Sequence, residues 1–566
     1  MNTCIEIRDL VFTYPGASVP TLNGINLTVE KGDFLAVIGG NGCGKSTLCK
    51  ALNGLIPHFI AGDYQGKVLI EGEDVQNSDI GSLAQKVGYV YQDFENQIVR
   101  PTVLDDASYA CLNYGMRDYL ERGKEALVQC GLVNQENEYI WQLSGGQTHL
   151  LALAGALALG PDILILDEPI AQLDPGHADR IYEILKELNE VYGKTIIVIE
   201  HHTEYIADYC KNVVLLKNGK TFWKLPAKDA MAKVDELLKN SIFPPQITQA
   251  AHQYFNREQK LPTTLEEGKK YFAQLDFQAD IQKERSIKHL LDKGKGEAAV
   301  SFHHVSLSYR SVKGEPRQIF DRISVQLCKG ERIALIGSNG AGKSTLMKLM
   351  IGLLKPTEGE ITVLGESIQK KKPETLAKQI SLVYQNPEDM FIKDSIYADI
   401  SYAMKIRNIP DWEEKTNALL ERFRLMEFAQ QDGRLLSGGQ MRRASLAIGI
   451  ALNPKILLLD EPTANLDIAT RKEIIRTLNE MREITETVMI ATHDMQLVSE
   501  WADRIIVLNQ GYIAADGIRD EIFGNKELAH LVGIRPPEIF QMGQALSPEA
   551  YCYTIDEFSS TFKERS

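Results

Sequence analysis

Cysteine is scarce in this sequence, and its eight cysteines are scattered without a single Cys-x-x-Cys pair. This spacing argues against a disulfide framework and against a zinc knuckle, because both need regularly spaced thiols. Scattered single cysteines are typical of proteins in a reducing compartment. We therefore expect neither structural disulfides nor a zinc site.

A secretory start and long apolar runs are also missing. The first residues, MNTCIEIRDL, contain no basic stretch followed by an apolar one, so we expect no signal peptide. The longest weakly polar run, 150–160, is far shorter than the roughly 20 residues of a spanning helix. We expect that the chain does not cross a membrane itself, although it can bind a membrane partner.

The sequence has no excess of positive charge. Its 62 Lys and Arg residues face 76 Asp and Glu residues, which gives a net charge of −14. A general nucleic-acid-binding surface is therefore not expected. The apolar content of 44% is that of an ordinary globular protein, and 566 residues exceed what one core usually holds.

What the sequence does have is an internal repeat. Three motifs occur twice in the same order and at nearly constant spacing: GGNGCGKST (39–47) and GSNGAGKST (337–345), LSGGQ (143–147 and 436–440), and LDEP (166–169 and 459–462). Chance does not produce such a series, so the chain contains a duplicated domain with one short insertion or deletion.

The repeat continues beyond these motifs. Pro244-Pro245-Gln246-Ile247 is echoed at 536–539, and TLEEGKKYF (264–272) is echoed by TIDEFSSTF (554–562). Each copy therefore ends in a small helical extension. We predict the first copy of the domain at 1–235, an extension and linker at 236–296, the second copy at 297–525 and a second extension at 526–566.

Each copy contains a phosphate-binding loop in the expected context. The apolar runs 34–38 and 333–336 predict buried strands, and each leads into a Gly-x4-Gly-Lys-Ser loop followed by a helical pattern. Glycines let the backbone wrap around phosphates, Lys45 and Lys343 would reach the outer phosphates, and Ser46 and Ser344 would bind Mg²⁺. Cys43 occupies a variable loop position, where a small inert residue is the simpler interpretation than a reactive thiol.

Carboxylates follow a second pair of buried strands. Asp167 and Asp460 would hold hydrated Mg²⁺, while Glu168 and Glu461 would activate the attacking water as general bases. Gln92 and Gln385, each in a Val-Tyr-Gln sequence, are candidates for sensing Mg²⁺ and water. His201 and His493 end the strands predicted at 195–199 and 487–491 and are candidates for contacting the terminal phosphate.

The LSGGQ sequences resemble the signature of ATP-binding-cassette (ABC) proteins, and the resemblance covers nearly the whole chain. It implies an α/β fold with two P-loop NTPase domains, each with a mostly parallel sheet core, an antiparallel β subdomain and a helical signature subdomain. It also implies that the two halves of the chain pair with each other around two ATP molecules. Each signature serine would cap a helix facing the γ-phosphate held by the other half.

The resemblance also implies roles for the remaining motif residues. Tyr14 and Tyr309 would stack on adenine, and Asp174 and Asp467 match the loop aspartates of the family. The expected ATP-binding residues are Tyr14, Gly39, Asn41, Gly42, Gly44, Lys45, Ser46, Thr47, Ser144, Gly145, Gly146 and Gln147 in the first copy, and Tyr309, Gly337, Asn339, Gly340, Gly342, Lys343, Ser344, Thr345, Ser437, Gly438, Gly439 and Gln440 in the second.

The two copies differ at two places in these motifs. The first signature continues with Thr148-His149-Leu150, where the second has Met441-Arg442-Arg443. The histidine at the end of the strand also follows different residues: His201 follows Glu200, whereas His493 follows Thr492. Neither difference removes a predicted catalytic group, so we expect both sites to be active.

Two kinds of protein compete for the function. One is the ATPase of a transporter with separate membrane subunits, and the other is a soluble tandem ABC ATPase that acts on ribosomes or nucleic acid. The joining segment 243–272 is interrupted by prolines and is not strongly basic, which favours the transporter.

The segments after the two glutamines, 92–110 and 385–403, are similar to ATPases of energy-coupling-factor (ECF) importers. This similarity implies a fused double ATPase at the cytoplasmic face of the cell membrane, bound peripherally to a transmembrane coupling subunit and a substrate-binding membrane subunit. It also implies import of a vitamin or a metal ion. Phe94, Ile98, Met390 and Phe391 are the expected contacts with the membrane partner, and no nucleic-acid partner is expected.

Overall fold

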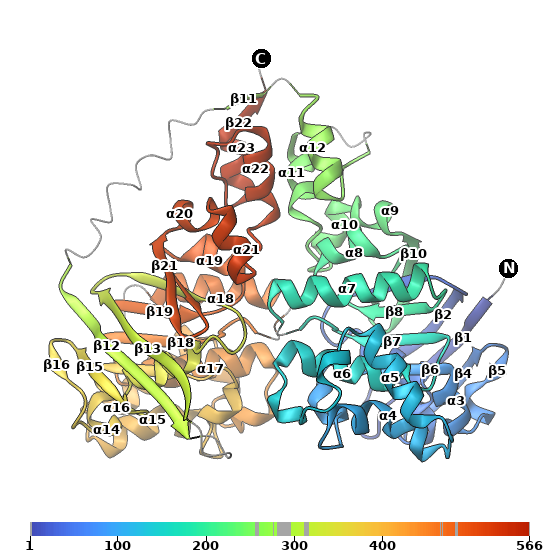
Figure 1. The fold of residues 1–566 in the computed structure, drawn as a ribbon, viewed down its shortest axis with the longest axis horizontal. Coiled ribbons are helices and arrows are strands. Elements are labelled where there is room, and N and C mark those ends of the chain that lie inside the picture. The colour runs from blue at the N-terminus through green and yellow to red at the C-terminus, as the bar shows by residue number, and fades with distance from the viewer. Residues whose placement is uncertain are drawn as a thin grey trace. The chain divides into compact units, whose positions relative to one another are not determined.

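A computed structural model describes residues 3–171, 173–254, 260–275, 277–279, 296–310, 316–464, 466, 468–481 and 485–564. The chain divides into two compact units, Met1–Phe277 together with Glu564–Ser566, and Gln278–Lys563. Each unit contains a six-stranded mixed sheet, a four-stranded antiparallel sheet and helices, in agreement with the predicted fold class (Figure 1). The boundaries at residues 236 and 526 between ATPase domain and extension stay a proposal, and most of the connector, 280–295, lies outside the described residues.

The mixed sheet of the first unit has the order β10-β9-β3-β8-β7-β6. All neighbouring strands in it are parallel except the β9–β10 pair. Its strands are β3 (Phe34–Ile38), β6 (Val87–Val90), β7 (Ile163–Asp167), β8 (Thr195–Ile199), β9 (Asn212–Lys217) and β10 (Lys220–Pro226).

Both faces of this sheet are covered, which explains the apolar run in β3. Phe34, Ala36 and Ile38 pack into the core formed with the helical part of the unit. Leu35 and Val37 pack into a second core shared with the antiparallel sheet and α1 (Lys45–Leu52). A strand that is buried on both faces needs apolar residues at every position, and so it does not alternate.

The antiparallel sheet of the first unit has the order β2-β1-β4-β5. Its strands are β1 (Thr3–Thr13), β2 (Leu22–Glu30), β4 (Asp63–Ile70) and β5 (Glu73–Asp74). The other helices of this unit are α2 (Leu55–His58), α3 (Ile80–Lys86), α4 (Val103–Asn113), α5 (Tyr119–Gln129), α6 (Gly145–Leu157), α7 (Pro175–Glu190), α8 (Thr203–Tyr209), α9 (Ala227–Met231), α10 (Val234–Lys239), α11 (Gln246–Tyr254) and α12 (Leu265–Phe272), and a short strand β11 (Phe277–Ala279) follows them.

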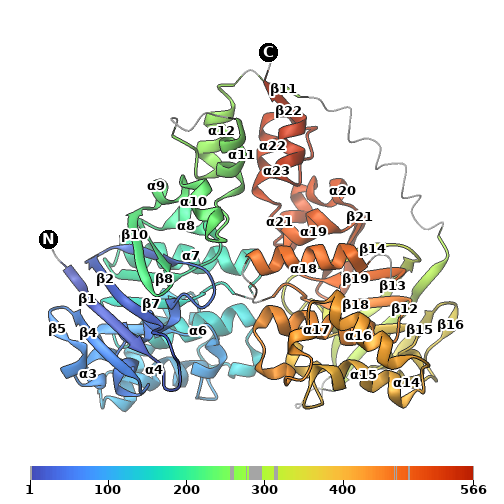
Figure 2. The same cartoon turned by 180° about the vertical axis from the view of Figure 1, so that it is seen from behind.

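The second unit repeats this architecture, as the view from behind shows (Figure 2). The mixed sheet, in the order β17-β18-β19-β14-β20-β21, consists of β14 (Arg332–Ile336), β17 (Ile380–Val383), β18 (Ile456–Asp460), β19 (Thr487–Ala491), β20 (Arg504–Asn509) and β21 (Tyr512–Ile518). The antiparallel sheet, in the order β13-β12-β15-β16, consists of β12 (Ala298–Arg310), β13 (Pro316–Cys328), β15 (Glu358–Val363) and β16 (Glu366–Ser367).

The helices of the second unit follow the order of those in the first, except that α2 has no counterpart among the described residues. They are α13 (Lys343–Met350), α14 (Pro373–Leu376), α15 (Ile396–Ile406), α16 (Trp412–Arg422), α17 (Gly438–Ile450), α18 (Ile468–Glu480), α19 (Met495–Trp501), α20 (Arg519–Phe523), α21 (Lys526–Val532), α22 (Glu538–Leu546) and α23 (Ile555–Thr561), and the strand β22 (Phe562–Glu564) follows them.

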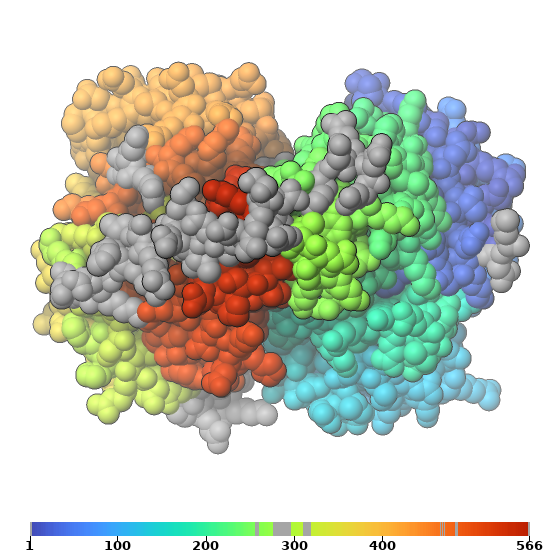
Figure 3. Space-filling view, turned by 90° about the horizontal axis from the view of Figure 1, so that it is seen from above, coloured from blue at the N-terminus to red at the C-terminus, as the bar shows by residue number. Residues whose placement is uncertain are grey.

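The echoed sequences near residues 264 and 554 are helix starts. Thr264 and Thr554 each accept a hydrogen bond from the backbone N–H three residues later, at Glu267 and Glu557. A threonine cap followed by glutamate at the third helical position satisfies two N–H groups that a helix start leaves open. These helices, α12 and α23, form part of each unit's terminal extension, which the space-filling view shows end-on (Figure 3).

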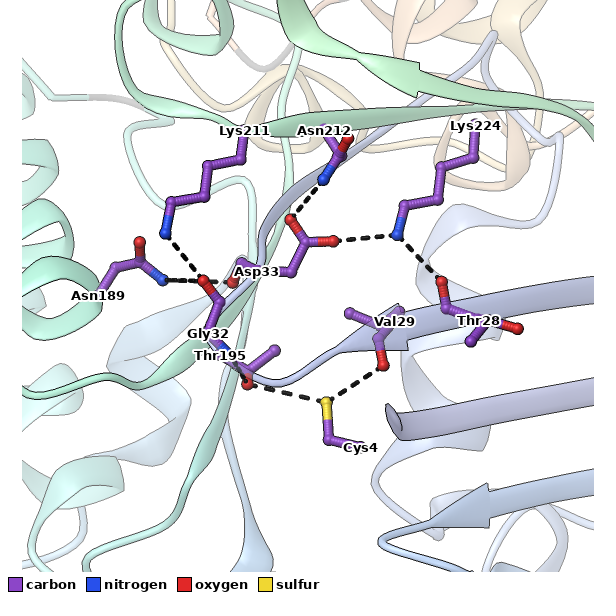
Figure 4. Close-up of polar contacts among 10 residues, drawn as sticks. All are labelled: Cys4, Thr28, Val29, Gly32, Asp33, Asn189, Thr195, Lys211, Asn212 and Lys224. Atoms are coloured by element: carbon purple, nitrogen blue, oxygen red, sulfur yellow. Dashed lines mark hydrogen bonds and ion pairs between the residues drawn. The ribbon is translucent and has the colours of Figure 1, made fainter. Parts of the chain in front are cut away.

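A buried polar cluster lies at the end of the first mixed sheet where strand β3 begins (Figure 4). The Asp33 carboxylate accepts hydrogen bonds from Asn212 at 2.9 Å and from Lys224 at 3.0 Å, and Lys224 also donates to the Thr28 carbonyl. Asn189 of α7 donates to the Gly32 carbonyl at 3.1 Å. The cluster ties β2, β9, β10 and α7 to the start of β3, and the opposite end of β3 is left for the phosphate-binding loop.

Candidate functional site

The first phosphate-binding loop is folded around its own lysine. Lys45 is buried, and its Nζ donates to the carbonyl oxygens of Gly39 at 2.9 Å and Gly40 at 3.3 Å. Gly39 has φ +155°, and a Cβ placed there would lie 2.5 Å from the Leu216 carbonyl oxygen. The loop therefore needs glycine at this position for space as well as for backbone conformation.

The second loop has the same construction. Lys343 Nζ donates to the carbonyl oxygens of Gly337 at 2.7 Å and Ser338 at 3.3 Å. A Cβ on Gly337 would lie 2.1 Å from the Leu508 carbonyl oxygen. In both units the lysine begins the helix that follows the loop, α1 or α13, so the positive end of that helix faces the loop.

The aspartates at the ends of β7 and β18 are buried beside the loop serines. Asp167 accepts a hydrogen bond from Ser46 and, at 3.3 Å, from the Tyr89 hydroxyl, while its Oδ1 atom has no partner among the described residues. Asp460 accepts from Ser344, and the part of the chain that the structure describes offers no partner to its Oδ1 either. Burial raises the pKa of both carboxyl groups.

These pairs fit a magnesium ion. Mg²⁺ is commonly bound by one or two protein oxygens while phosphates and water supply its other ligands. A buried carboxylate oxygen that accepts no hydrogen bond, next to a serine hydroxyl, suits such a site. Within the described residues no group of three or more His, Cys, Asp or Glu side chains is arranged to hold a metal ion. An ion at either site would therefore depend on the nucleotide for much of its coordination.

The next residue along, Glu168, lies between the predicted glutamine and histidine. Its Oε2 accepts a hydrogen bond from Gln92 Nε2 at 2.7 Å, and its Oε1 lies 3.1 Å from His201 Nε2. Burial alone would raise the pKa of Glu168, but the hydrogen bond from His201 and the nearby charges of His201 and Lys45 together outweigh burial, and the pKa is lowered. The carboxyl group is therefore ionised near neutral pH and able to accept a proton.

Glu461 has the same backbone conformation, with φ +46° against +52° for Glu168, but different contacts. Its Oε1 lies 2.9 Å from Nδ1 of His493, and its Oε2 accepts the His493 backbone N–H at 3.4 Å. Although burial opposes it, the charge of His493 lowers the pKa of Glu461. Among the described residues, Gln385 makes no hydrogen bond to Glu461, so the structure brings His493 but not Gln385 to the second carboxylate.

The signature sequences begin helices α6 and α17. Ser144 accepts a hydrogen bond from Gln147 N–H, and the Gln147 side chain accepts one from Ser144 N–H. Gln440 accepts the Ser437 N–H at 3.0 Å in the same way. Gly146 lies against His177, where an added Cβ would be 2.0 Å from the ring, and Gly439 lies against Thr470 at 2.6 Å. Gly145 and Gly438 complete the two turns.

The remaining predicted ligands lie around the loops. The Tyr14 hydroxyl lies 3.2 Å from Thr47 Oγ1, and its ring packs edge-on against Phe12. Tyr309 is 42% exposed. Asp174 caps α7 through the His177 N–H, whereas Asp467 lies outside the described residues. Asn41, Gly42 and Gly44 lie in the first loop, Asn339, Gly340 and Gly342 in the second, and Thr345 in the first turn of α13. Adenine stacking by the two tyrosines stays a prediction.

Cys43 matches the simpler of its two interpretations. The side chain is buried, and burial raises the pKa of its thiol. A thiol with a raised pKa forms little thiolate at neutral pH and reacts slowly.

The structure also gives contacts that the motifs did not predict, at the signature, one of the two places where the copies differ. Arg442 is buried and donates to the carbonyl oxygens of Tyr384 at 3.0 Å and Gln385 at 2.7 Å, which ties α17 to the glutamine segment. Its counterpart His149 instead stacks on Phe94, with ring centroids 4.2 Å apart. Neither ring nitrogen of His149 has a hydrogen-bond partner in the described part of the chain, and burial lowers the pKa of this histidine to about 4.

None of the helices described here combines the length and apolar character needed to span a bilayer. The family model described as "ABC transporter" matches residues 22–171 and 320–464, more than half of the chain. Each match begins in the antiparallel sheet, contains the loop, the signature and the carboxylates, and ends just after them.

Comparison with individual proteins agrees with the family match. A protein from Caldanaerobacter subterraneus, provisionally named an ABC transporter ATP-binding protein, is 32% identical over 96% of this chain and 96% of its own length. YkoD of Bacillus subtilis, provisionally named an HMP/thiamine import ATP-binding protein, is 31% identical over 92% of this chain and 93% of its own. The solved structure of cbiO1 from Clostridium perfringens, part of the ABC transporter complex cbiONQ, is 30% identical and covers 44% of this chain and 98% of its own, with a TM-score of 0.39. The chain belongs to the ABC transporter family and is an ATP-binding, ATP-hydrolysing subunit with two ABC ATPase domains in tandem.

Proposed function

We propose that this protein is the double ATPase of an ECF-type importer and that it powers solute uptake through membrane subunits encoded as separate chains. The observation that carries the proposal is the similarity to YkoD over nine-tenths of both chains, because the name of that relative assigns it to import. The segments after Gln92 and Gln385, which resemble those of ECF ATPases, support the same class. The solute would be a vitamin or a metal ion.

For the chemistry, we assign matching roles to the residues gathered in each unit. Ser46, Asp167 and Gln92 would hold Mg²⁺, which neutralises charge on the phosphates when it is bound. Lys45 and the loop amides bind the phosphates, Glu168 accepts the proton of the attacking water, and His201 orients that carboxylate and the terminal phosphate. In the second unit Ser344, Asp460, Gln385, Lys343, Glu461 and His493 take these roles.

We further propose that the two halves of one chain pair, so that each signature turn, 144–147 or 437–440, completes the ATP site of the other half. Pairing within a chain does not depend on collisions between molecules. The ATPase activity per mole of protein should therefore stay constant when the protein concentration is lowered a hundredfold. A specific activity that falls in proportion to concentration would mean that the active pairing is between chains.

The contact with the coupling subunit is assigned to the segments that follow the glutamines. Val99 and Ile392 occupy equivalent places and are 59% and 61% exposed. Buried aspartates fix their backbones: Asp106 accepts the Val99 N–H at 2.8 Å, and Asp399 accepts the Ile392 N–H at 2.9 Å. Each segment therefore presents an apolar side chain to the outside on a rigid backbone.

Two of the contacts expected from sequence are less accessible than these. Phe391 is buried and packs against Gly433, and Phe94 stacks on His149. A polar substitution at either position would disturb the unit's own core. Val99 and Ile392 are therefore better positions at which to test partner binding.

The proposal is tested by extracting the tagged protein from cell membranes with detergent and identifying what co-purifies. Two kinds of integral membrane protein should be recovered. One is the coupling subunit, and the other is a substrate-binding subunit, of which several different ones can bind the same coupling subunit. The double variant Val99→Glu and Ile392→Glu should lose them while the purified chain still hydrolyses ATP. Val191→Glu, at a side chain that is 73% exposed, is the matched control and should keep them. Recovery with ribosomes at physiological salt, and absence from the membrane fraction, would contradict the importer assignment.

A further inference from the structure

His201 and His493 each lie in a short loop that follows a strand, β8 or β19, and we call this loop the switch loop. The hydrogen bonds that hold the switch loop differ between the two units. In the first unit the Glu200 side chain is buried, and its Oε1 accepts the backbone N–H groups of His201 at 2.8 Å and His202 at 2.9 Å. Its Oε2 accepts the hydroxyl of Tyr182, a fully buried residue of α7, at 2.8 Å. Three donors therefore fix one carboxylate, and that carboxylate fixes the loop.

In the second unit the equivalent position is Thr492, which keeps one of these contacts. Its hydroxyl accepts the N–H of Asp494, the counterpart of His202, at 3.0 Å and is also hydrogen-bonded to Glu461. The His493 N–H is accepted by Glu461 itself, at 3.4 Å. The carboxylate that we assign as general base therefore also holds the switch loop in this unit.

The first unit separates these two tasks. Because Glu200 holds the loop, no oxygen of Glu168 accepts a backbone N–H of residues 201–202, and Glu168 instead bonds the Gln92 amide at 2.7 Å. The histidine ring is also presented differently, with Nε2 of His201 facing Glu168 and Nδ1 of His493 facing Glu461.

We propose that Glu200 is a positioning residue of the first ATP site. Glu200 holds the switch loop, so that the Glu168 carboxylate is free to hydrogen-bond the Gln92 amide and Nε2 of His201. This inference rests on the catalytic roles proposed above for Glu168 and His201. Glu200 acts through His201 and need not contact the nucleotide. The two sites therefore prepare the same carboxylate in different ways, and the loss of Glu200 should impair only the first.

The test is a double-mutant cycle in the full-length chain, with kcat and KM for ATP as readouts. Glu200→Thr, which introduces the residue of the second unit, should lower kcat about tenfold, because small displacements of catalytic groups have large effects on rate. KM for ATP should change by less than about twofold, because no ligand of the nucleotide is removed. In a His201→Ala background the same substitution should change kcat by less than about twofold, since there is no longer a side chain to position.

The cycle is run in a Glu461→Gln background, so that turnover reports the first site. If Glu461→Gln alone abolishes turnover, the two sites act as one unit, and the cycle is read in the otherwise unchanged chain. Glu200→Asp keeps the charge and withdraws the carboxylate by one methylene, and it serves if Glu200→Thr does not fold. Tyr182→Phe leaves both loop N–H groups bonded to Glu200 and is the matched control, with kcat within about threefold of the parent.

Equal losses with and without the His201 side chain would mean that Glu200 has only a structural role and would overturn the inference. Unchanged kcat in Glu200→Thr would overturn it as well. Failure of the underlying catalytic assignment is recognised separately, because Glu168→Gln would then retain turnover whatever the outcome of the cycle.

Discussion

His149 gives the first unit a specific sensitivity to acid. The side chain is 1% exposed, the ring stacks on Phe94, and neither ring nitrogen finds a hydrogen-bond partner among the residues that the structure describes. Burial lowers its pKa from 6.5 to about 4, because a charged imidazolium would lose its hydration without gaining an acceptor. The folded protein therefore binds fewer protons at this residue than the unfolded chain does.

The sign and size of the effect follow from linkage. His149 does not affect the free energy of unfolding well above pH 6.5, and it lowers that free energy as the pH falls from 6.5 toward 4. With these two pKa values, the loss is about 2 kcal/mol at pH 5 and about 3 kcal/mol below pH 4. For a unit of this size, 2 kcal/mol corresponds to a fall in Tm of about 3–4 °C.

The assay is differential scanning calorimetry of the full-length chain at pH 7 and pH 5. His149→Leu puts an apolar side chain of similar size in place of the titrating ring, so its Tm should fall less than that of the parent between these pH values, by about 3–4 °C. His530→Leu, at an exposed histidine of α21, is the control and should behave like the parent. An equal fall in the parent and in His149→Leu would show that this histidine is not buried in its neutral form.

Two further predictions concern the loop and the sheet edge. Gly337→Ala should prevent ATP binding by the second site while the first still binds, because the added Cβ would lie 2.1 Å from the Leu508 carbonyl oxygen; equilibrium dialysis should then find half of the parent's bound ATP, and an unchanged amount would contradict the steric argument. Asp33→Ala should lower the free energy of unfolding by about 2–4 kcal/mol, because it removes a buried partner of Lys224. Lys31→Ala, which removes an exposed ion pair with Asp162, should lower it by less than about 1 kcal/mol. Equal losses for the two variants in urea titrations would contradict the role of burial.

The local parts of this fold could be predicted well from the sequence. The strands at Thr195–Ile199 and Thr487–Ala491 lie where their apolar runs predicted them, and a helix follows the first loop as predicted, over Lys45–Leu52. Such runs are informative because the sheet is buried on both faces, and the repeat supplied each pattern twice.

The contacts that distinguish the two sites could not be predicted in the same way. The sequence showed that Glu200 replaces Thr492 and that His149 replaces Arg442, but not what these side chains touch. Glu200 bonds Tyr182 only because α7 packs beside the end of β8, and such long-range contacts depend on tertiary structure. Buried polar groups take whatever partners the packing provides, so their roles follow from the assembled fold.

The central claim is that one chain carries two ATP sites whose turnover depends on Glu168 and Glu461. The most direct measurement is the nucleotide content and the ATPase rate of the double variant Glu168→Gln and Glu461→Gln. We predict two ATP molecules retained per 63.3 kDa chain and a rate lowered by about 10²–10⁴-fold, since a general base contributes that much. A rate close to that of the parent, or a single bound nucleotide per chain, would contradict this account.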